Sequence, residues 1–314
     1  MSEAKKIATR ETYGKTLVEL GAEMPDLVVL DCDLAGATKT GVFKKAYPER
    51  HVDCGIAESN MMSIAAGLAA AGMVPFASTF AMFAAGRAFE QIRNSIGYPH
   101  LNVKIGATHA GISVSEDGAS HQCLEDLALM RTIPGMVVMC PADATEAGKA
   151  VRAAAEYEGL VYIRLGRASV PVIFDEDYDF RIGKGRVIRE GKDVSIIATG
   201  LCVASALEAA EMLNRDGIDA EVINICTIKP LDEELIVKSA AKTGKVVTAE
   251  EHNIIGGLGS AVAECLVEKC PTKMYRIGMR DKFGESGSAE ELIHKYMLDG
   301  EGIYKQVKAF VEDN

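Results

Sequence analysis

The sequence contains no tryptophan, and only 6% of its 314 residues are aromatic. It also contains no C-x-x-C pair, and no ligand set for zinc is visible. The eight cysteines are scattered along the chain and lie mostly in apolar, strand-like segments. We interpret them as reduced thiols of the protein core. They lie at positions 32, 54, 123, 140, 202, 226, 265 and 270.

The sequence lacks a basic excess and a long apolar run. Its 34 Lys and Arg residues are outnumbered by 45 Asp and Glu residues, and the formal net charge is -11. Such a chain repels a phosphate backbone, which argues against a nucleic-acid partner. No apolar run approaches the roughly 20 residues of a membrane span, and residues 1–10 lack the apolar core of a signal peptide. We therefore expect a cytoplasmic protein without a membrane partner.

What the sequence does contain is a regular alternation of strand-like and helix-like segments. This pattern is typical of parallel sheets that are covered by helices on both faces. Expected strands lie at 26–33, 50–56, 73–79, 101–108, 135–142, 159–166, 193–200, 219–225, 245–251 and 273–279. Expected helices lie at 38–47, 60–71, 80–96, 123–131, 143–157, 202–215, 232–242, 257–268, 288–296 and 301–312. We expect Asp143 to be the N-cap of the helix at 143–157 and Gly72 to close the helix at 60–71.

The alternation fails in an acidic, turn-rich stretch that includes "SVPVIFDEDYDF". We place a linker at 171–192, between a domain at 1–170 and a second domain at 193–314. The predicted fold class is therefore α/β, with two tandem doubly wound domains and mostly parallel sheets. This fold names no function by itself.

One carboxylate, Glu58, stands at the start of the helix in "CGIAESNMMSIAAGLAAAG". The helix at 60–71 is apolar on every face, so we expect it to be buried. In one interpretation the Glu58 carboxylate only interacts with the positive end of the helix dipole, while Ser59 or Asn60 caps the helix. This interaction would stabilise the helix by roughly 0.3–1 kcal/mol. In the other, burial keeps a proton on the carboxyl group near neutral pH, ready to be shared with a bound base.

The polar loop "THAGISVSEDGASHQ" carries His109, Asp117 and His121 beyond the carboxyl end of an expected strand. Open α/β sheets bind ligands at this edge. The three side chains fit a solvated loop, a metal site, or a surface for hydroxyl binding and proton transfer. The sequence offers no third imidazole at a matching spacing, so support for a metal is weak.

Two aromatic residues and two arginines complete the candidates. Phe80 and Phe83 are three positions apart and share a helix face, which fits either core packing or a platform for a cofactor. Arg10 and Arg164 lie beside expected helix or strand ends. Each could pair with an acidic side chain or bind a phosphate.

Taken together, "CGIAESNMMSIAAGLAAAG", "STFAMF", "THAGISVSEDGASHQ", "RTIPGMVVMCPAD" and "MRDKFGESG" resemble the transketolase family over essentially the whole chain. The resemblance is to the pyrimidine-binding and C-terminal domains, as in the C-terminal half of a split transketolase. In full-length members a preceding domain carries a "GDG…NN" motif that holds Mg²⁺ and the diphosphate of thiamine diphosphate. This sequence contains neither GDG nor NN. The resemblance therefore implies an N-terminal partner subunit, in an assembly with two copies of each chain.

The resemblance also implies roles for individual residues. Glu58 matches the glutamate that hydrogen-bonds N1′ of the cofactor's aminopyrimidine and favours the imino tautomer, which removes the thiazolium proton. Phe83 matches the aromatic residue that stacks on the pyrimidine, Phe80 its neighbour, and Asp33 an aspartate near the cofactor. The implied reaction transfers a two-carbon ketol unit between a ketose phosphate and an aldose phosphate.

The substrate positions follow from the same resemblance. Arg10, His109 and Arg164 match positions that bind the phosphate of the sugar. Asp117 matches a residue that binds a donor hydroxyl, and His121 one that contacts the carbonyl and hydroxyl groups. His109 and His121 are thus implied in catalysis together with Glu58.

Some positions depart from the family pattern, and other identities stay open. Gly86 stands where many members have a tyrosine, Ala37 where a serine helps to bind phosphate, and "GASH" replaces "GPTH". A subunit like 1-deoxyxylulose-5-phosphate synthase, or like the beta subunit of a two-oxoacid dehydrogenase, would share the cofactor machinery. A noncatalytic paralogue that scaffolds an enzyme is the alternative from a different class.

Overall fold

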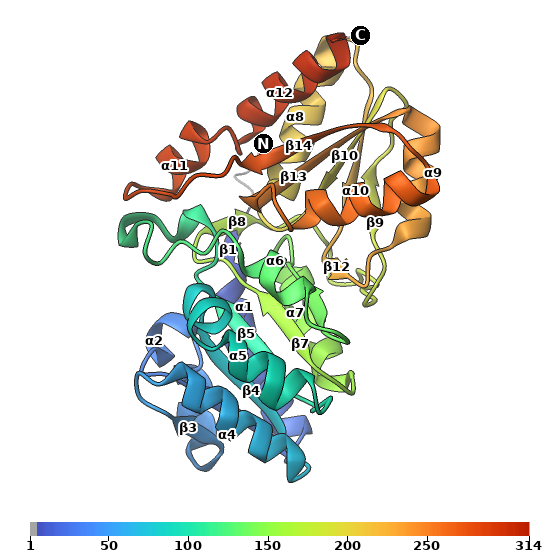
Figure 1. The fold of residues 1–314 in the computed structure, drawn as a ribbon. Coiled ribbons are helices and arrows are strands. Elements are labelled where there is room, and N and C mark those ends of the chain that lie inside the picture. The colour runs from blue at the N-terminus through green and yellow to red at the C-terminus, as the bar shows by residue number, and fades with distance from the viewer. Residues whose placement is uncertain (1–4, 314) are drawn as a thin grey trace.

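The computed structural model describes residues 5–313, which form two α/β units, one above the other in Figure 1. The larger sheet belongs to the lower unit and has seven strands in the order β12-β6-β7-β5-β4-β2-β3. Its central strands are buried along their full length, as expected of a sheet covered on both faces. The seven strands are β2 (Leu27–Asp31), β3 (His51–Asp53), β4 (Val74–Phe80), β5 (Lys104–Thr108), β6 (Val137–Met139), β7 (Val161–Arg164) and β12 (Thr227–Lys229).

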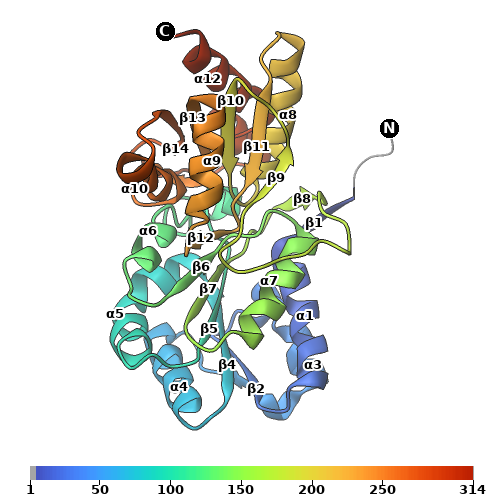
Figure 2. The same ribbon diagram turned by 90° about the vertical axis from the view of Figure 1, so that its right-hand side faces the viewer.

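Helices cover both faces of this sheet, as Figure 2 shows. One face carries α1 (Thr9–Glu23), α3 (Gly41–Ala46) and α7 (Ala144–Glu156), and the other carries α4 (Glu58–Ala70), α5 (Phe89–Gln91) and α6 (Asp126–Arg131). Shorter helical pieces are α2 (Ala35–Thr38), the 3₁₀ turns η1 (Pro48–Arg50) and η4 (Ile112–Asp117), and the π-helical segments η2 (Met82–Arg87) and η3 (Ile92–Gly97).

The upper unit contains a five-stranded sheet in the order β14-β13-β10-β11-β9. Its strands are β9 (Arg186–Arg189), β10 (Val194–Ala198), β11 (Ala220–Asn224), β13 (Lys245–Asn253) and β14 (Lys273–Met279). Its helices are α8 (Cys202–Arg215), α9 (Glu233–Thr243), α10 (Leu258–Lys269), α11 (Ala289–Lys295) and α12 (Gly300–Glu312). A separate pair of strands, β1 (Lys6–Ala8) and β8 (Ser169–Pro171), is antiparallel.

The predicted fold class is confirmed. Among the named strands of residues 5–313, every pairing is parallel except those made by β1–β8, β9 and β12. One apolar cluster runs from Leu30 and Met61 in the lower unit to Ile223 and Leu258 in the upper unit. The two units therefore pack as one body. Because of this packing, residues of the upper unit can reach the candidate site on the lower one.

Several local predictions are also confirmed. The side chain of Asp143 accepts a hydrogen bond of 2.8 Å from the backbone N–H of Glu146, so it caps α7 as predicted. Helix α4 ends at Ala70, and Gly72 follows with a φ of +89°, a conformation that favours glycine.

Other local predictions are wrong. The helix expected over 80–96 is instead a series of π-helical and short α-helical turns, which shifts its side chains away from a 3.6-residue period. The helix expected over 38–47 breaks at Lys39, whose φ is +71°. Strand β12 lies in the range predicted for the second domain, yet it pairs with β6 of the first sheet. The predicted linker contains β9, which joins the second sheet.

Helix α4 differs from the expectation of complete burial. Met61, Met62, Ala65 and Ala66 are buried against the sheet, whereas Asn60, Ser63 and Gly67 point outward and are exposed. The sequence misled because small apolar residues occupy both faces of this helix. Its outer face is thus smooth and weakly polar.

Candidate active site

The candidate site forms where neighbouring parallel strands of the larger sheet end. Phe80 is the last residue of β4, and its register partner Thr108 is the last residue of β5. Asp33 follows β2, and His109 follows β5 directly. The carboxyl ends of β2, β4 and β5 therefore bring residues from separate parts of the sequence to one edge of the sheet.

Phe80, Phe83, His109 and His121 form an aromatic cluster at this edge. The rings of Phe80 and Phe83 are nearly parallel, with centroids 5.8 Å apart. His109 stacks on Phe80 at 3.8 Å, and His121 meets Phe83 edge-on at 5.4 Å. Four of the predicted site residues thus form one cluster, although Phe80 and His121 are 41 positions apart in the sequence.

Glu58 is the first residue of α4 and is only 1% exposed. Its Oε2 atom lies 2.7 Å from Nη1 of Arg87, and the Arg87 guanidinium lies 4.6 Å from the centroid of the Phe83 ring. The capping interpretation is wrong in its detail, because the N-cap is Ala57 and makes no side-chain cap. The buried carboxylate is therefore held by an ion pair whose cation also lies over a ring of the aromatic cluster.

Arg87 is a site residue that the sequence reasoning missed. It lies four positions after Phe83 in the π-helical segment η2, and its side chain is 48% exposed. A cation at that spacing from an aromatic residue was the available signal. The sequence did not reveal that Arg87 pairs with Glu58, because the two residues are 29 positions apart.

His109 is 3% exposed and is held at both ring nitrogens. Nη1 of Arg10 lies 2.9 Å from Nε2 of His109, and Oγ1 of Thr108 lies 2.9 Å from Nδ1. Because arginine only donates hydrogen bonds, Nε2 accepts and the ring proton sits on Nδ1, which donates to Thr108. Burial, reinforced by Arg10, lowers the pKa of His109 to about 3. The imidazole is therefore neutral at physiological pH.

Arg10 supplies the positive charge beside this neutral ring. Its Nη1 also donates to the carbonyl of Ala37 at 2.9 Å. Burial lowers the pKa of Arg10 from its usual value, and the positive charge of Arg167 lowers it further. Within residues 5–313, Nε of Arg10 is buried and has no hydrogen-bond partner. An anion bound by Arg10 would satisfy that donor.

The loop that bears Asp117 and His121 has an unusual backbone. Gly111 and Gly118 have φ values of +80° and +73°, and Ser115 has a φ of +74° between them. The Asp117 side chain is 41% exposed, and its Oδ2 lies 3.5 Å from Nη1 of Arg167. Asp117 is therefore available to a ligand beside the Arg167 guanidinium. The His121 ring of this loop faces the Phe83 ring.

The structure places Arg164 differently from the prediction. Arg164 is 5% exposed, and its Nε donates to the Asp126 carboxylate at 2.9 Å. Its Nη2 donates to the carbonyls of Cys123 and Glu251, at 3.3 and 2.8 Å. A guanidinium committed to these groups is poorly placed to bind a phosphate. Arg167, three residues further along and 34% exposed, instead faces the loop, with its Nη1 atom 3.5 Å from Oε2 of Glu116 and from Oδ2 of Asp117.

Asp33 lies at the same sheet edge but shows no role of its own. It is exposed, its φ is +60°, and its backbone N–H donates to the Asp53 carboxylate at 3.0 Å. Contact between Asp33 and a cofactor stays a prediction. Residues 5–313 contain no group of three His, Cys, Asp or Glu side chains able to hold a metal ion. No helix in the same range is long and apolar enough to cross a membrane.

Two family models match this chain. The model described as the pyrimidine-binding domain of transketolase matches residues 5–172, and the model described as the C-terminal domain of transketolase matches residues 183–303. Together they leave only short stretches unmatched.

The chain is also similar to several individual proteins. A Methanocaldococcus jannaschii protein named for the C-terminal section of transketolase is 52% identical, over 95% of this chain and 94% of its own. A 6-deoxy-6-sulfo-D-fructose transketolase subunit of Clostridium is 44% identical, over 96% of this chain and 94% of its own. Human transketolase is 38% identical over 98% of this chain, which spans 49% of the human protein.

A solved structure gives the same result. A split-gene transketolase, described as an inactive β4 tetramer, is 57% identical with a TM-score of 0.91, and the match covers 97% of this chain and 98% of that one.

Proposed function

This chain belongs to the transketolase family, and we propose that it is the C-terminal subunit of a split transketolase that transfers a two-carbon ketol unit between sugar phosphates. The single observation that carries the proposal is the buried Glu58 carboxylate, whose partner Arg87 also lies over the Phe83 ring. These two groups are what an aminopyrimidine needs, namely a partner for a ring nitrogen and an aromatic surface.

The residues present fit thiamine diphosphate. The Arg87 guanidinium, a planar group that carries hydrogen-bond donors, already lies against both the Glu58 carboxylate and the Phe83 ring. An aminopyrimidine has the same two requirements. When bound, the cofactor supplies a nucleophilic carbon to the reaction. Glu58 would hold and share a proton at the ring nitrogen, Phe83 would stack on the ring, and Phe80 would close the pocket behind His109.

The remaining site residues suit a sugar phosphate. Arg10 and Arg167 would bind the phosphate as charge-assisted donors, with the neutral His109 fixing the orientation of Arg10. Asp117 would accept a hydrogen bond from a sugar hydroxyl. His121 would contact the carbonyl and hydroxyl groups of the donor, because it lies on the same loop as Asp117 and its ring faces the Phe83 ring.

A second chain would complete the active site. The sequence contains neither the GDG nor the NN element with which the family holds Mg²⁺ and the diphosphate. We therefore propose an N-terminal partner subunit that carries these elements, with two copies of each chain and self-association of this one. The description of the solved relative as an inactive β4 tetramer supports the need for such a partner.

Reconstitution tests this function. The purified chain is combined with the GDG-bearing chain, thiamine diphosphate and Mg²⁺, with xylulose 5-phosphate as donor and ribose 5-phosphate, among other aldose phosphates, as acceptor. We expect product only when both chains are present. Condensation of pyruvate with glyceraldehyde 3-phosphate instead would support a synthase-like subunit. No turnover with either substrate set, in a complex that holds cofactor, would contradict the proposed function.

A further inference from the structure

The upper unit holds the start of the loop that carries Asp117 and His121. Glu251 on β13 is 4% exposed, and its Oε1 accepts a hydrogen bond of 2.6 Å from the backbone N–H of Ser113. The Gly111 backbone passes so close that a Cβ atom there would lie 2.3–2.6 Å from the atoms of the Glu251 carboxylate. The first turn of the loop is thus built against this one side chain.

The upper unit also holds the end of the loop. Nε2 of Gln122 donates to the carbonyl of Glu285 at 2.8 Å, and lies 3.2 and 3.3 Å from the carbonyls of Ile112 and Ser115. A Cβ atom on Gly284 would lie 1.9 Å from the Gln122 amide oxygen. In Figure 1 the loop lies beside the segment that leads into α11, and η4 contacts α11. Gln122, directly after His121, therefore ties both ends of the loop to the upper unit.

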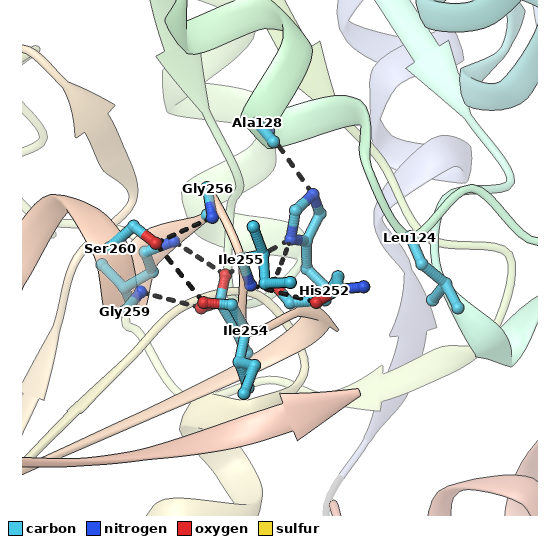
Figure 3. Close-up of polar contacts among 12 residues, drawn as sticks. Leu124, Ala128, His252, Ile254, Ile255, Gly256, Gly259 and Ser260 are labelled. Atoms are coloured by element: carbon cyan, nitrogen blue, oxygen red, sulfur yellow. Dashed lines mark hydrogen bonds and ion pairs between the residues drawn. The ribbon is translucent and has the colours of Figure 1, made fainter. Parts of the chain in front are cut away.

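Polar contacts below the loop connect the same two units (Figure 3). The backbone N–H of Asn253 donates to the carbonyl of Leu124 at 2.8 Å, and that of Ala128 lies 3.4 Å from Nε2 of His252. Nδ1 of His252 lies 2.7 Å from the Asn253 carbonyl, so it donates there and Nε2 accepts. The buried Arg164, between Asp126 and Glu251, joins these contacts. The chain is thus fixed on both sides of Gln122.

We propose that the upper, C-terminal unit positions the substrate loop, with Glu251 and the Glu285 carbonyl acting on it through Ser113 and Gln122. Glu251 and Gln122 are positioning residues in this account. They hold Asp117 and His121 in place and thereby set the affinity for the sugar donor. The kinetic part of the inference rests on the proposed function, whereas the placement of the loop does not.

Hydrogen–deuterium exchange on the isolated chain tests the placement. In Glu251→Ala the acceptor of the Ser113 N–H is lost, and we expect the amides of 109–122 to exchange about tenfold faster. Glu251→Gln keeps an acceptor oxygen and should retain most of the protection. Gln122→Leu removes the donor at the other end and should also speed exchange, which keeps the test decisive if Glu251→Ala does not fold. Glu234→Ala, an exposed change on α9 of the same unit, is the matched control and should leave exchange unchanged.

Kinetics of the reconstituted complex test the consequence. In Glu251→Ala or Gln122→Leu we expect the KM for the ketose donor to rise about tenfold, because an unrestrained loop must be ordered on binding. The affinity for thiamine diphosphate, measured by calorimetry, should stay within about twofold, since Glu58 and Phe83 lie outside the loop. General misfolding would weaken the binding of both the ketose donor and thiamine diphosphate.

Two results would overturn the inference. One is unchanged exchange of 109–122 in both variants, and the other is faster exchange with an unchanged donor KM. An inactive wild-type complex would instead contradict the proposed function, while the exchange experiment would still decide the placement of the loop.

Discussion

At the scale of single residues, Glu58 carries the chemistry that we propose. It is buried at the first position of α4, and its partner Arg87 lies over the Phe83 ring. Glu58→Gln keeps the shape of the side chain but cannot share a proton with a ring nitrogen. In the reconstituted complex we expect kcat to fall by about 10²–10⁴-fold, the range for loss of a general acid–base group. The exposed Glu234→Gln is the control. Full activity of Glu58→Gln with bound cofactor would contradict the assignment.

Arg87 pairs with Glu58 and so affects stability when no cofactor is present. In Arg87→Gln a buried carboxylate loses its cation. We expect the free energy of unfolding in urea to fall by about 1–3 kcal/mol, the cost of an uncompensated buried group. Arg93→Gln, an exposed change in the neighbouring π-helical segment η3, should shift it by no more than about 0.5 kcal/mol. Equal losses in the two variants would argue against the ion pair.

His109 makes stability depend on pH. Its pKa is lowered to about 3 in the folded chain by burial and by Arg10, against 6.5 for an ordinary histidine. The unfolded chain therefore binds the extra proton first, and the stability that His109 contributes is lost as pH falls from 6.5 toward 3. We expect His109→Asn to lose less stability than the wild type between pH 7 and pH 5 in urea titrations. His294→Asn is the comparison, because Asp299 raises the pKa of His294. Replacing His294 should therefore not reduce the loss of stability between pH 7 and pH 5.

At the scale of elements, the loop 109–122 depends on glycine at two positions with the same backbone. Gly111 has φ +80° and ψ −171°, and Gly118 has φ +73° and ψ −170°. An alanine at either position costs about 1–3 kcal/mol through the backbone alone. The neighbours differ, because Gly111 faces the fixed Glu251 carboxylate and Gly118 faces the hydroxyl of Ser286.

Gly111→Ala should therefore destabilise the chain by about 1–3 kcal/mol more than Gly118→Ala, through overpacking against Glu251. Urea unfolding of the two variants under the same conditions measures the difference. A smaller loss of unfolding free energy in Gly111→Ala than in Gly118→Ala would mean that the Glu251 side chain moves aside readily. The loop would then be less firmly held than the contacts indicate.

The elements also show what the sequence could predict. Helix α4 with Glu58 at its start, the strand ends and the polar loop follow from local patterns of apolar and polar residues. Pairing across large separations does not. The Glu58–Arg87 ion pair joins positions 29 apart, and the Gln122–Glu285 contact joins positions 163 apart. Nor does any spacing reveal which of two nearby cations, Arg164 or Arg167, meets the buried Asp126.

At the scale of the whole molecule, the chain presents surfaces that suit a larger assembly. The outer face of α4 exposes Asn60, Ser63 and Gly67, and Ile56 just before Glu58 is 77% exposed. Small, weakly polar side chains let another backbone approach closely. The face lies next to Glu58, where a second chain would be needed to complete the cofactor site. Position and composition together favour contact between subunits at this edge.

Native mass spectrometry of the chain isolated gently from its own cells tests the central claim most directly. The account predicts an assembly with two copies of this chain, two copies of a GDG-bearing chain and bound thiamine diphosphate. A homo-oligomer without cofactor, in cells where no such second chain co-purifies, would contradict it and would favour a noncatalytic paralogue.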